Sequence, residues 1–484
     1  MDPLNLSQLL PTTEAVGPEG LRAQVTGIAY RSDRVRPGDA FFCVPGFVHD
    51  GHEFAADAAA RGASVLVTSH MVDIPAIPQV VVADTRQALA LASAVFFGDP
   101  SHRMALVGVT GTNGKTTTAY IIDSILREAG HTTGIVGTVE TRIAGAREPA
   151  GRTTPESRDL QALLAHMIDE GVDAAVMEVS SHAIDLHRVD GVRFAVAAFT
   201  NLSQDHLDYH PSIEEYFSVK SRLFRHVAPD SQVVNIDDEH GRRLVVQTGA
   251  EWTVGVSPEA RVRATRIEMG LRSTSLDLVT PQGTRRLALP LTGAFNVSNA
   301  LVAAGCGLAL GIPLDTVVAG LEAAPQVPGR LERIEEGQPF AVFVDYAHTP
   351  DGLEKAITAV RAVTAGRVIT VFGCGGDRDP AKRPLMGHAA ASLSDIAIVT
   401  SDNPRSEDPV GIILQVEDGM THCAASKHVE VDRRHAIGLA LSLAREGDAV
   451  LIAGKGHEDY QIFADRTIHF DDREVASEEL RRLC

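Results

Sequence analysis

Residues 110–117 carry the clearest chemical signal in the chain, with the sequence TGTNGKTT. An apolar run of strand length precedes them at 105–109, and a helical pattern of isoleucine and leucine follows them. Small residues let backbone N–H groups close around phosphate oxygens, and a helix N-terminus adds partial positive charge. Lys115 can reach terminal phosphates, and a threonine hydroxyl can ligate Mg²⁺. The segment therefore predicts a nucleoside triphosphate site formed by a strand, a glycine turn and a helix.

The strict phosphate-loop pattern G-x-x-x-x-G-K-[ST] is missed by one position, because residue 109 is valine and the first glycine of the turn is Gly111. A shortened G-x-x-G-K-T pattern remains, and it keeps the lysine and the hydroxyl groups. A glycine-rich start of a helix without a ligand is the alternative interpretation.

Polar residues also follow two expected strands of the central region. Ligands of doubly wound α/β sheets bind at the carboxyl ends of strands, so we expect Glu178 and His206 to lie near Lys115 and Thr116. Mg²⁺ prefers a few oxygen ligands besides water and phosphate, so these residues predict a metal site. Alternatively, Glu178 caps the turn that follows it, or His206 is a core histidine bonded to Asp205.

Residues 214–224 have the aromatic and aliphatic spacing of a helix, and Lys220 lies close to its apolar side. A surface lysine whose stem covers that side is one interpretation. Further along, residues 293–300 open a helix of small residues that runs to Leu310. There Asn296 either bonds an adenine edge or caps the helix.

The last third of the chain has a second set of alternating strands and helices. Four of its strands end in polar loops, at residues 345–350, 373–379, 401–405 and 454–458. At one edge of a sheet these loops would form a pocket in which Arg378, Asp402, Arg405 and Glu458 reach one another. Arginine pairs bidentately with a carboxylate and an acidic side chain receives an ammonium group, so the pocket complements a zwitterionic amino acid. Any single loop could instead be a structural turn.

The N-terminal 103 residues mix short strands and helices without a phosphate loop. Arg31, Arg34 and Arg36 gather in a turn before an apolar strand. Cations in a turn indicate an anion site, although a solvated turn explains them equally well.

At 484 residues the chain exceeds the size of one hydrophobic core, so we expect three domains. A smaller α/β N-terminal domain would span residues 1–103, and a central doubly wound parallel sheet with the phosphate loop would span 104–328. A C-terminal Rossmann-like α/β domain would span 329–484.

Lys and Arg number 44 against 63 Asp and Glu, a formal charge of −19 that repels nucleic acid and anionic membranes. An anionic ligand must therefore be held by a local cluster of cations. The five cysteines are scattered and odd in number, which fits structural thiols in a reducing cytoplasm. The first ten residues contain acidic and polar side chains where a signal peptide needs a basic and then an apolar stretch, and no run in the sequence reaches membrane-span length. We therefore expect neither a signal peptide nor a membrane span. We expect a cytoplasmic monomer.

Nine motifs occur in a fixed order along the chain. They read GTNGKTT (111–117), EVSSH (178–182), NLSQDHLDYH (201–210), YFSVKSRLF (216–224), GAFNVSNA (293–300), PGRLE (328–332), DYAHTP (345–350), GGDRD (375–379) and GKGHE (454–458). Together they resemble the Mur ligase family of ATP-dependent amide-bond-forming ligases, and the shortened phosphate loop is that family's own variant. DNPR at 402–405 resembles the signature of members that add meso-diaminopimelate rather than lysine.

The resemblance implies roles for the residues around the nucleotide. ATP would contact Gly111, Thr112, Asn113, Gly114, Lys115, Thr116 and Thr117, together with Asn296, Arg330 and His348. The catalytic residues would be Lys115, Glu178, His206 and Lys220. Glu178 would bridge two Mg²⁺ ions and His206 would hold the second of them. Lys220 would be carbamylated, so that it presents a carboxylate rather than an ammonium group to metal, and the Thr116 hydroxyl would be a further metal ligand.

The resemblance also implies two substrate sites. UDP-N-acetylmuramoyl dipeptide would contact Ser32, Phe47, Val48, His49, Thr153, Thr154, Ser180 and Arg188. Diaminopimelate would contact Arg378, Asp402, Asn403, Pro404, Arg405, Gly454 and Glu458. Two positions depart from the family, since Arg31-Ser32-Asp33 stands where D-S-R is commoner and Leu186 stands where some relatives have a substrate-contacting glutamine.

The implied reaction joins meso-2,6-diaminopimelate to the D-glutamate carboxylate of UDP-N-acetylmuramoyl-L-alanyl-D-glutamate through an acyl phosphate, in peptidoglycan precursor synthesis. Three alternatives are open. A sister ligase such as a folylpolyglutamate synthase would lack DNPR and the N-terminal domain. A kinase would join no second substrate, and a non-enzymatic nucleotide-binding regulator would have no use for Lys220.

Overall fold

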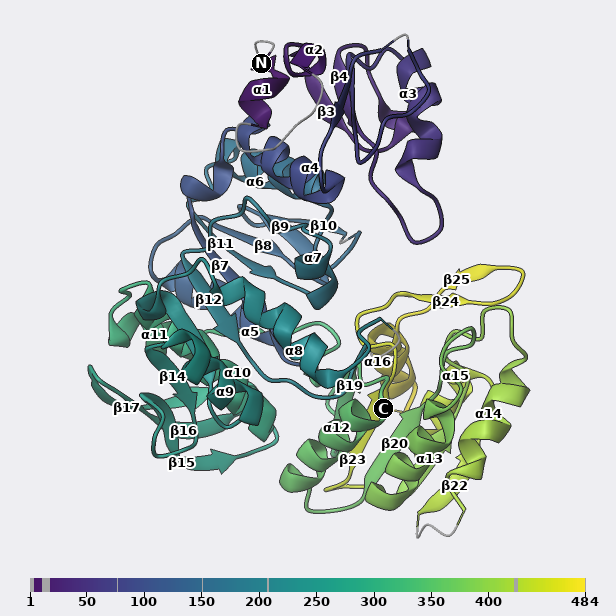
Figure 1. Ribbon diagram of the computed structural model, residues 1–484. Coiled ribbons are helices and arrows are strands. Elements are labelled where there is room, and N and C mark those ends of the chain that lie inside the picture. Colours follow the sequence, from purple (N-terminus) through teal and green to yellow (C-terminus); the bar gives the residue numbers. More distant parts are fainter. Residues whose placement is uncertain are drawn as a thin grey trace. The chain divides into compact units, whose positions relative to one another are not determined.

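The computed structural model describes residues 4–10, 18–75, 77–149, 151–206, 209–421 and 425–483 (Figure 1). The chain forms two compact units: unit 1 is Met1–Arg263 with Leu301–Gly320, and unit 2 is Ala264–Ala300 with Leu321–Cys484. Both contain parallel β-sheet with flanking helices, so the predicted α/β fold class is confirmed. Across the described residues, every helix is too short or too polar to span a bilayer. The domain boundaries at 103 and 328 stay a prediction.

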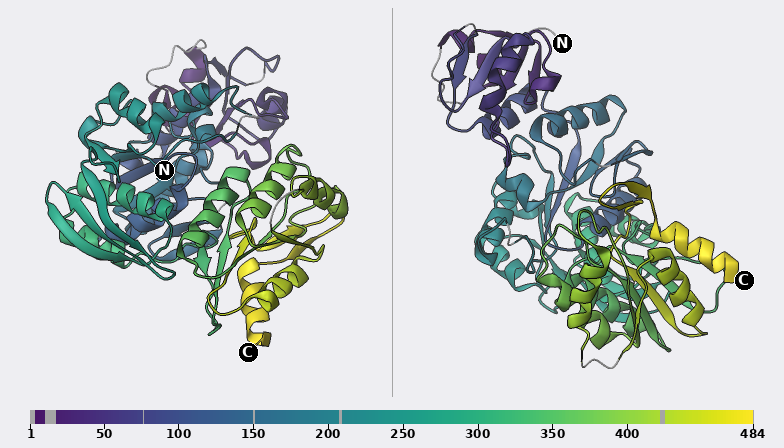
Figure 2. Two further views of the ribbon diagram at one scale, coloured as in Figure 1. Left: turned by 90° about the horizontal axis from the view of Figure 1, so that it is seen from below. Right: turned by 90° about the vertical axis from the view of Figure 1, so that its right-hand side faces the viewer.

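The first sheet of unit 1 has four parallel strands, in the order β3 (Gly27–Ala29), β4 (Asp39–Phe42), β5 (Val65–Thr68) and β6 (Gln79–Val81). The sheet belongs to the purple part of the ribbon in Figure 2. Side chains alternate between its faces, so Phe42 packs with α1 (Leu6–Leu9) and α4 (Thr85–Phe96), whereas Phe41 packs with α3 (Ala55–Ala60). The same part contains β1 (Leu4–Asn5), β2 (Gln24–Val25), α2 (Pro18–Leu21) and 3₁₀ turns at Ser32–Arg34 and Gly51–Phe54.

The second sheet of unit 1 contains the phosphate loop. Its parallel strands lie in the order β8 (Thr133–Val136), β11 (Ala174–Glu178), β7 (Ala105–Thr110), β12 (Val196–Phe199), β13 (Gln232–Asn235) and β14 (Trp252–Gly255). The chain visits one side of β7 and then the other, which makes the crevice at the carboxyl end of β7 the expected ligand site. The associated helices are α5 (Lys115–Glu128), α6 (Ser157–Asp169), α7 (Ser181–Asp185), α8 (Ile213–Ser221) and α9 (Glu239–Thr248).

An antiparallel hairpin of β9 (Glu140–Ile143) and β10 (Ala146–Pro149) extends this sheet beside β8, and the sequence pattern does not predict it. Its turn contains Ala144 and Gly145 at φ values of 47° and 91°. Strand β10 is exposed along its whole length, so it offers no apolar alternation to detect.

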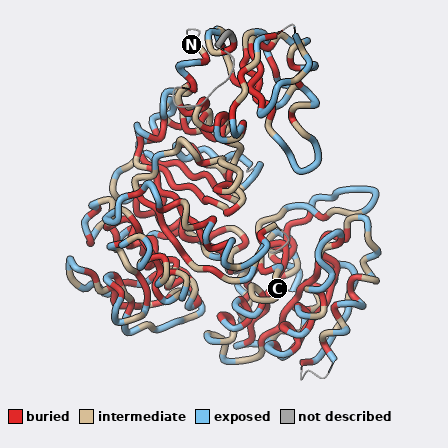
Figure 3. The backbone as a smooth tube through the Cα atoms, viewed as in Figure 1, coloured by how far each residue is buried: buried red, intermediate tan, exposed pale blue. Residues whose placement is uncertain are grey.

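Unit 2 is organised around a six-stranded sheet. Its strands lie in the order β18 (Glu332–Arg333), β19 (Ala341–Asp345), β23 (Ala449–Ala453), β20 (Val368–Phe372), β21 (Ile396–Val399) and β22 (Ser426–Val429), all parallel except β18. Helices α12 (Pro350–Val363), α13 (Lys382–Leu393) and α14 (Pro409–Asp418) cover one face, and α15 (Arg433–Leu443) and α16 (Asp472–Leu483) cover the other. The central strands are therefore buried on both sides (Figure 3, red).

Two hairpins complete unit 2: β16 (Thr274–Thr280) with β17 (Gly283–Leu289), and β24 (Tyr460–Ile462) with β25 (Thr467–His469). Strand β15 (Val262–Met269) and helices α10 (Ala294–Ala309) and α11 (Leu314–Glu322) have residues in both units. Each of the four polar loops predicted in the C-terminal third follows a strand of the six-stranded sheet, namely β19, β20, β21 and β23, to within about two residues, which is the usual uncertainty of element boundaries.

Candidate active site

The predicted strand, glycine turn and helix are confirmed by β7, residues 111–114 and α5. Gly111 has φ 146° and Gly114 has φ 87°, and residues with a side chain rarely adopt such backbone conformations. A Cβ atom on Gly111 would lie 2.0 Å from the Thr200 hydroxyl oxygen. The turn therefore requires glycine at this position for both conformation and space.

The segment after β12 holds this loop in place. The Thr112 N–H donates to the Asn201 carbonyl oxygen at 2.8 Å, and the Asn113 N–H donates to the Asn201 side-chain oxygen at 3.0 Å. The Thr200 hydroxyl donates to the Asn113 carbonyl oxygen at 2.7 Å. The phosphate loop is thus shaped by hydrogen bonds within the protein before any ligand binds.

Two lysines converge on one carbonyl of the loop. Lys115 Nζ donates to the Gly111 oxygen at 3.0 Å and to the Thr112 oxygen at 2.9 Å, and Lys220 Nζ donates to the same Gly111 oxygen at 2.9 Å. Lys220 is buried, and its amine lies 4.5 Å from the centre of the Tyr216 ring. Burial, and next the charge of Lys115, lowers the pKa of Lys220 well below its ordinary value. The interpretation of Lys220 as a surface lysine is therefore wrong.

Glu178 lies at the end of β11, buried beside the start of α5. Its carboxylate accepts hydrogen bonds from the Thr116 hydroxyl at 3.1 Å, the Thr138 N–H at 2.8 Å and the Thr138 hydroxyl at 3.0 Å. The helix α7 that follows is capped by Ser180, which accepts the Ala183 N–H at 3.1 Å. The interpretation of Glu178 as a cap is therefore wrong, and its predicted proximity to Thr116 is confirmed.

His206 has φ 54° and an exposed ring, so the interpretation as a core histidine is wrong. Its ring centre lies 4.9 Å from that of His182 and 6.3 Å from that of Tyr216. Its Nε2 atom lies 3.5 Å from an Asp205 carboxylate oxygen. Within the described residues there is no group of three or more His, Cys, Asp or Glu side chains that could hold a metal ion.

Several residues expected to contact the UDP-N-acetylmuramoyl dipeptide gather around Glu178. The Thr153 hydroxyl lies 3.0 Å from the Thr138 hydroxyl, and the Thr154 hydroxyl donates to the Glu178 backbone oxygen at 2.8 Å. Arg188 donates to the Thr154 backbone oxygen at 3.1 Å. Burial lowers the pKa of Arg188, although the guanidinium also pairs with Glu156 at 2.8 Å. The loop cluster at the ends of β7, β11 and β12 is thus continuous with these residues.

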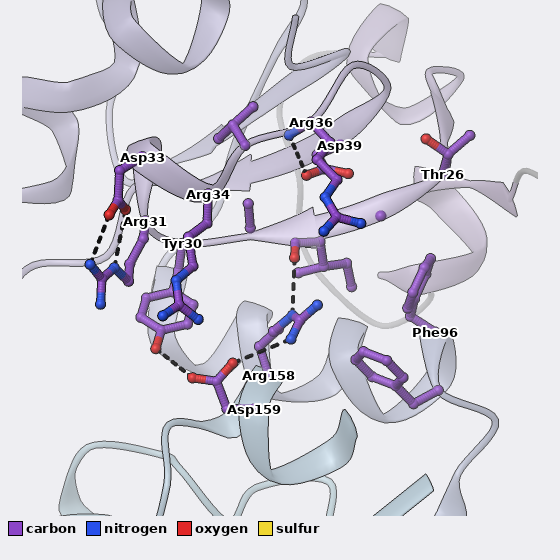
Figure 4. A pocket seen from close by; sticks show the side chains of 15 residues that line it. Thr26, Tyr30, Arg31, Asp33, Arg34, Arg36, Asp39, Phe96, Arg158 and Asp159 are labelled. Atoms are coloured by element: carbon purple, nitrogen blue, oxygen red, sulfur yellow. Dashed lines mark hydrogen bonds and ion pairs between the residues drawn. The ribbon is translucent and has the colours of Figure 1, made fainter. Parts of the chain in front are cut away.

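A cavity of about 690 Å³ is lined by residues on either side of Ser32 (Figure 4). The Tyr30 hydroxyl donates to Asp159 at 2.6 Å, and Arg31 pairs with Asp33 at 2.8 Å. Arg31, Arg34 and Arg36 are all exposed, and the charge of Arg31 is balanced by Asp33. Of the other residues predicted to contact the sugar nucleotide, Phe47, Val48 and His49 lie on an exposed loop.

The four polar loops of unit 2 meet at the carboxyl edge of its sheet, as predicted. The Asn403 amide donates to Glu458 Oε2 at 3.0 Å, and a Cβ atom on Gly454 would lie 2.7 Å from an Asp402 carboxylate oxygen. A Cβ atom on Gly375 would lie 2.9 Å from Arg405 Nη1 and 3.8 Å from Arg378 Cγ. Arg405 itself has φ 51° and donates to the Gly376 oxygen at 2.7 Å.

Three further residues of unit 2 were expected to contact the nucleotide. Arg330 and His348 both lie against Tyr346, since the guanidinium carbon of Arg330 is 4.6 Å from the ring centre and His348 Nδ1 is 2.8 Å from the Tyr346 carbonyl oxygen. Asn296 lies inside α10, buried, and its amide donates to the Thr292 oxygen at 2.8 Å. A helix cap would accept a backbone N–H, whereas Asn296 donates to a backbone oxygen and accepts the Asn299 amide at 3.0 Å, so these bonds do not make Asn296 a cap.

Sequence reasoning does not identify two buried cations of unit 2. Lys455 is fully buried and donates to Asn403 Oδ1 at 3.1 Å. Arg433 is fully buried and pairs with Asp472 through two bonds of 2.8 and 2.7 Å. The available signal for Lys455 is a lysine between two glycines directly after an apolar strand, whereas Arg433 follows an ordinary helix cap.

Three family models match successive parts of the chain. The model described as Mur ligase family, catalytic domain, matches residues 24–105. The Mur ligase middle domain matches 109–307, and the Mur ligase glutamate ligase domain matches 329–456.

A protein of Solibacter usitatus (strain Ellin6076), named UDP-N-acetylmuramoyl-L-alanyl-D-glutamate--2,6-diaminopimelate ligase, is 47% identical over 99% of this chain and 98% of its own length. A solved structure of a ligase with the same name is 29% identical, covers 100% of this chain and 99% of its own, and has a TM-score of 0.73. Folylpolyglutamate synthase of Mycobacterium tuberculosis, complexed with ADP and AMPPCP, is 22% identical over 82% of this chain and 94% of its own, with a TM-score of 0.62, and shares the fold alone. The chain belongs to the Mur ligase family, within its group of UDP-N-acetylmuramoyl-L-alanyl-D-glutamate--2,6-diaminopimelate ligases.

Proposed function

We propose that this protein uses ATP to join meso-2,6-diaminopimelate to the D-glutamate carboxylate of UDP-N-acetylmuramoyl-L-alanyl-D-glutamate. The observation that carries the proposal is a phosphate loop whose first helical turn hydrogen-bonds a buried carboxylate, through Thr116 and Glu178. The full-length relatives bear the name of this reaction, which supports the choice of substrates. The product is a peptidoglycan precursor, and the nucleotide substrates favour a cytoplasmic location.

The reaction has two bond-forming steps. The γ-phosphoryl group of ATP passes to a D-glutamate carboxylate oxygen, giving an acyl phosphate and ADP. The diaminopimelate amine then attacks the acyl carbon and forms a tetrahedral intermediate. The nitrogen loses a proton, and the intermediate collapses to the amide with release of phosphate. Phosphoryl transfer depends on in-line placement and neutralised charge rather than on a protein nucleophile. Lys115 would supply positive charge to the phosphates from the loop that holds it.

We propose that Lys220 is carbamylated in the active enzyme. Its lowered pKa leaves more of the amine neutral, and a neutral amine can bond to the carbon of CO₂ and release a proton. The product is a carbamate, so a buried ammonium becomes a buried carboxylate at the phosphate loop. That change gives a reason for a lysine to be buried against Lys115, where two ammonium groups repel each other.

The residues at the loop fit a magnesium ion. The Thr116 hydroxyl and the Glu178 carboxylate are hard oxygen donors 3.1 Å apart, and Mg²⁺ needs only one or two such ligands besides water and phosphate. Glu178 accepts three hydrogen bonds, whereas a carboxylate has about four lone-pair sites, so one site is left for an ion. His206 and the Lys220 carbamate would hold a second ion. When bound, the metal neutralises developing charge on the phosphate oxygens.

The loop cluster of unit 2 would bind diaminopimelate. Arg405 and Arg378 would hold the distal carboxylate, while Glu458 and the Gly454 backbone would hold the distal ammonium group. Lysine lacks that carboxylate, and a polar group left without its partner costs about 1–3 kcal/mol. The remaining substrate, a uridine diphosphate sugar, would be bound by Ser32 and the Phe47–His49 loop, with its peptide at Thr153, Thr154, Ser180 and Arg188.

Phosphate release tests this function directly. Purified protein with ATP, Mg²⁺ and UDP-N-acetylmuramoyl-L-alanyl-D-glutamate should release phosphate with meso-diaminopimelate, and far less with L-lysine or with no amine. Mass spectrometry should find the tripeptide nucleotide as the product. ATP turnover that does not depend on the dipeptide nucleotide and the amine would contradict the proposal.

A further inference from the structure

Lys455 is a charged side chain with no exposed surface, placed directly behind two residues of the proposed amino-acid site. Its ammonium group donates to Asn403 Oδ1 at 3.1 Å and lies 3.6 Å from Glu458 Oε2. The Tyr460 ring centre lies 5.5 Å from the same nitrogen. A buried ammonium is costly without such partners, so its presence needs a reason beyond packing.

The contacts of Lys455 fix the orientation of the Asn403 amide. Asn403 Oδ1 accepts two hydrogen bonds, one from Lys455 and one from the Ile462 N–H at 3.0 Å. A reversed amide would place its NH₂ group against two donors, so the NH₂ group must face Glu458. It donates there to Glu458 Oε2 at 3.0 Å.

This arrangement makes the two oxygens of Glu458 different. Oε2 lies beside both the Asn403 amide and the Lys455 ammonium group. Oε1 has the long contact of 3.5 Å with the Tyr346 hydroxyl. Oε1 therefore keeps more of its capacity than Oε2 to accept a hydrogen bond from a ligand.

We propose that Lys455 is a positioning and specificity-determining residue: through Asn403 it holds one oxygen of Glu458 and so presents the other oxygen to the ammonium group of the incoming amino acid. This inference rests on the proposed function, and it assigns to Lys455 a role that acts through Asn403 and Glu458 rather than by contact with substrate. It also explains why a lysine, rather than an apolar residue, follows Gly454.

The charge of Lys455 has a second consequence. Burial, and then the charge of Asp402, raises the pKa of Glu458, whereas Lys455 and Arg405 lower it. Without Lys455 the carboxylate would take up a proton at a higher pH and could no longer attract an ammonium group. The titratable and charged groups around Glu458 are Tyr346, Asp402, Arg405, Arg433, Lys455 and Tyr460.

Two variants separate position from charge. Lys455→Met removes both the donor and the charge, and Lys455→Gln removes the charge but keeps an NH₂ donor on a shorter side chain. We expect the KM for diaminopimelate to rise more than about tenfold in K455M and less in K455Q, as the loss of one charged hydrogen bond predicts. The KM for ATP should stay within about twofold, since that site uses other residues. As the pH is lowered, the KM for diaminopimelate should begin to rise earlier in both variants, that is, at a higher pH than in the unaltered protein.

Arg367→Met is the matched control. Arg367 pairs with Asp448 at 2.6 Å, away from the loop cluster, so its loss should lower stability without changing the KM for diaminopimelate. An unchanged KM and pH profile in K455Q, or equal losses for ATP and diaminopimelate in K455M, would overturn the inference and leave the proposed function intact. No diaminopimelate-dependent phosphate release by the unaltered protein would instead contradict the proposed function, and the positioning role with it.

Discussion

The loop clusters of the two units lie at the same place in their sheets and are built in different ways. In unit 1 the phosphate loop is held mostly by backbone groups and small side chains, such as the bonds of Asn113 to Thr200 and Asn201, and the two lysines add bonds to the Gly111 oxygen. In unit 2 the loops are held by buried charges. Lys455 donates to the Asn403 side-chain oxygen, and Arg433 donates to the backbone oxygen of Ala453, the residue before Gly454. Both positions are the expected ligand sites of parallel α/β sheets.

The difference follows from what each site must bind. Phosphate groups vary little in shape, so N–H groups and a helix N-terminus are sufficient and need glycine at fixed positions. A zwitterionic amino acid carries separate charges of both signs, so its site needs ionised side chains in fixed directions. Charges that are partly buried need ion-pair partners or hydrogen bonds around them, and these partners also fix their direction.

Breaking the buried pair of unit 2 should have the largest effect. Arg433→Met leaves Asp472 as an unpaired buried carboxylate, which costs about 3–5 kcal/mol of unfolding free energy. Guanidinium denaturation, monitored by hydrogen exchange in peptides of β23, should show this loss of stability in unit 2.

Two comparisons make that result specific. The double variant that combines Arg433→Met and Asp472→Leu should regain most of the lost stability, because no unpaired charge remains. Arg367→Met, whose partner Asp448 lies in a more exposed pair, should cost less. Equal losses from the two arginines would show that unit 2 does not depend on its buried charges.

Lys220→Ala should produce the next largest effect, now in unit 1. We expect kcat for phosphate release to fall by about 10²–10³, or about 3–4 kcal/mol, as for loss of one preorganised electrostatic group. The unaltered protein should also carry the mass of one CO₂ on Lys220, and its activity should fall in carbonate-free buffer. Lys355→Ala is the control, because Lys355 is half exposed in a pair with Asp351. Full activity of K220A would contradict the carbamate.

Arg405→Ala should have a smaller effect, confined to the choice of amino acid. Loss of the guanidinium leaves the distal carboxylate without its partner, so the preference for diaminopimelate over lysine should fall by about ten- to a hundredfold, or about 1–3 kcal/mol. The ratio of kcat/KM for the two amines measures it. The KM for ATP should be unaffected, and an unchanged preference would rule out Arg405 as the selecting residue.

The contrast between the units also explains what could be predicted from the sequence. Gly111, Lys115 and Thr116 are recognisable because backbone-built sites impose residue types at fixed spacings. The proximity of Glu178 to Thr116 follows from strand order, since β11, which ends at Glu178, and β7, which leads into the loop before Thr116, end at the same edge of one sheet. The roles of these residues in catalysis stay a prediction.

Other features lie beyond reasoning from the pattern alone. The burial of Lys220 is settled by tertiary packing against Tyr216 and the Gly111 carbonyl, and the helical spacing fits a surface lysine equally well. The pair of Arg433 and Asp472 joins two helices 39 residues apart, and no local signal marks it. The β9–β10 hairpin is missed because its outer strand is exposed and charged.

The smallest predicted effect concerns the acid stability of the unit 2 cluster. His457 packs 4.9 Å from the Tyr346 ring centre, and burial, followed by the charge of Arg330, lowers its pKa from 6.5 to about 4. Between these two pH values His457 binds a proton in the unfolded chain but not in the folded chain. The unfolding free energy therefore falls as the pH is lowered from 6.5 to about 4. After allowance for solvent screening this amounts to about 1–2 kcal/mol.

His457→Phe keeps an aromatic ring against Tyr346 and removes the titration, so the dependence of stability on pH in that window should flatten. Denaturant titrations of unit 2 at several pH values measure the slope, and the exposed His435 supplies a control substitution that should leave it unchanged. An undiminished slope in H457F would assign the acid sensitivity to other groups. The buried charges would then account for the shape of the cluster but not for its response to acid, and the contrast with the backbone-built phosphate loop would be one of geometry alone.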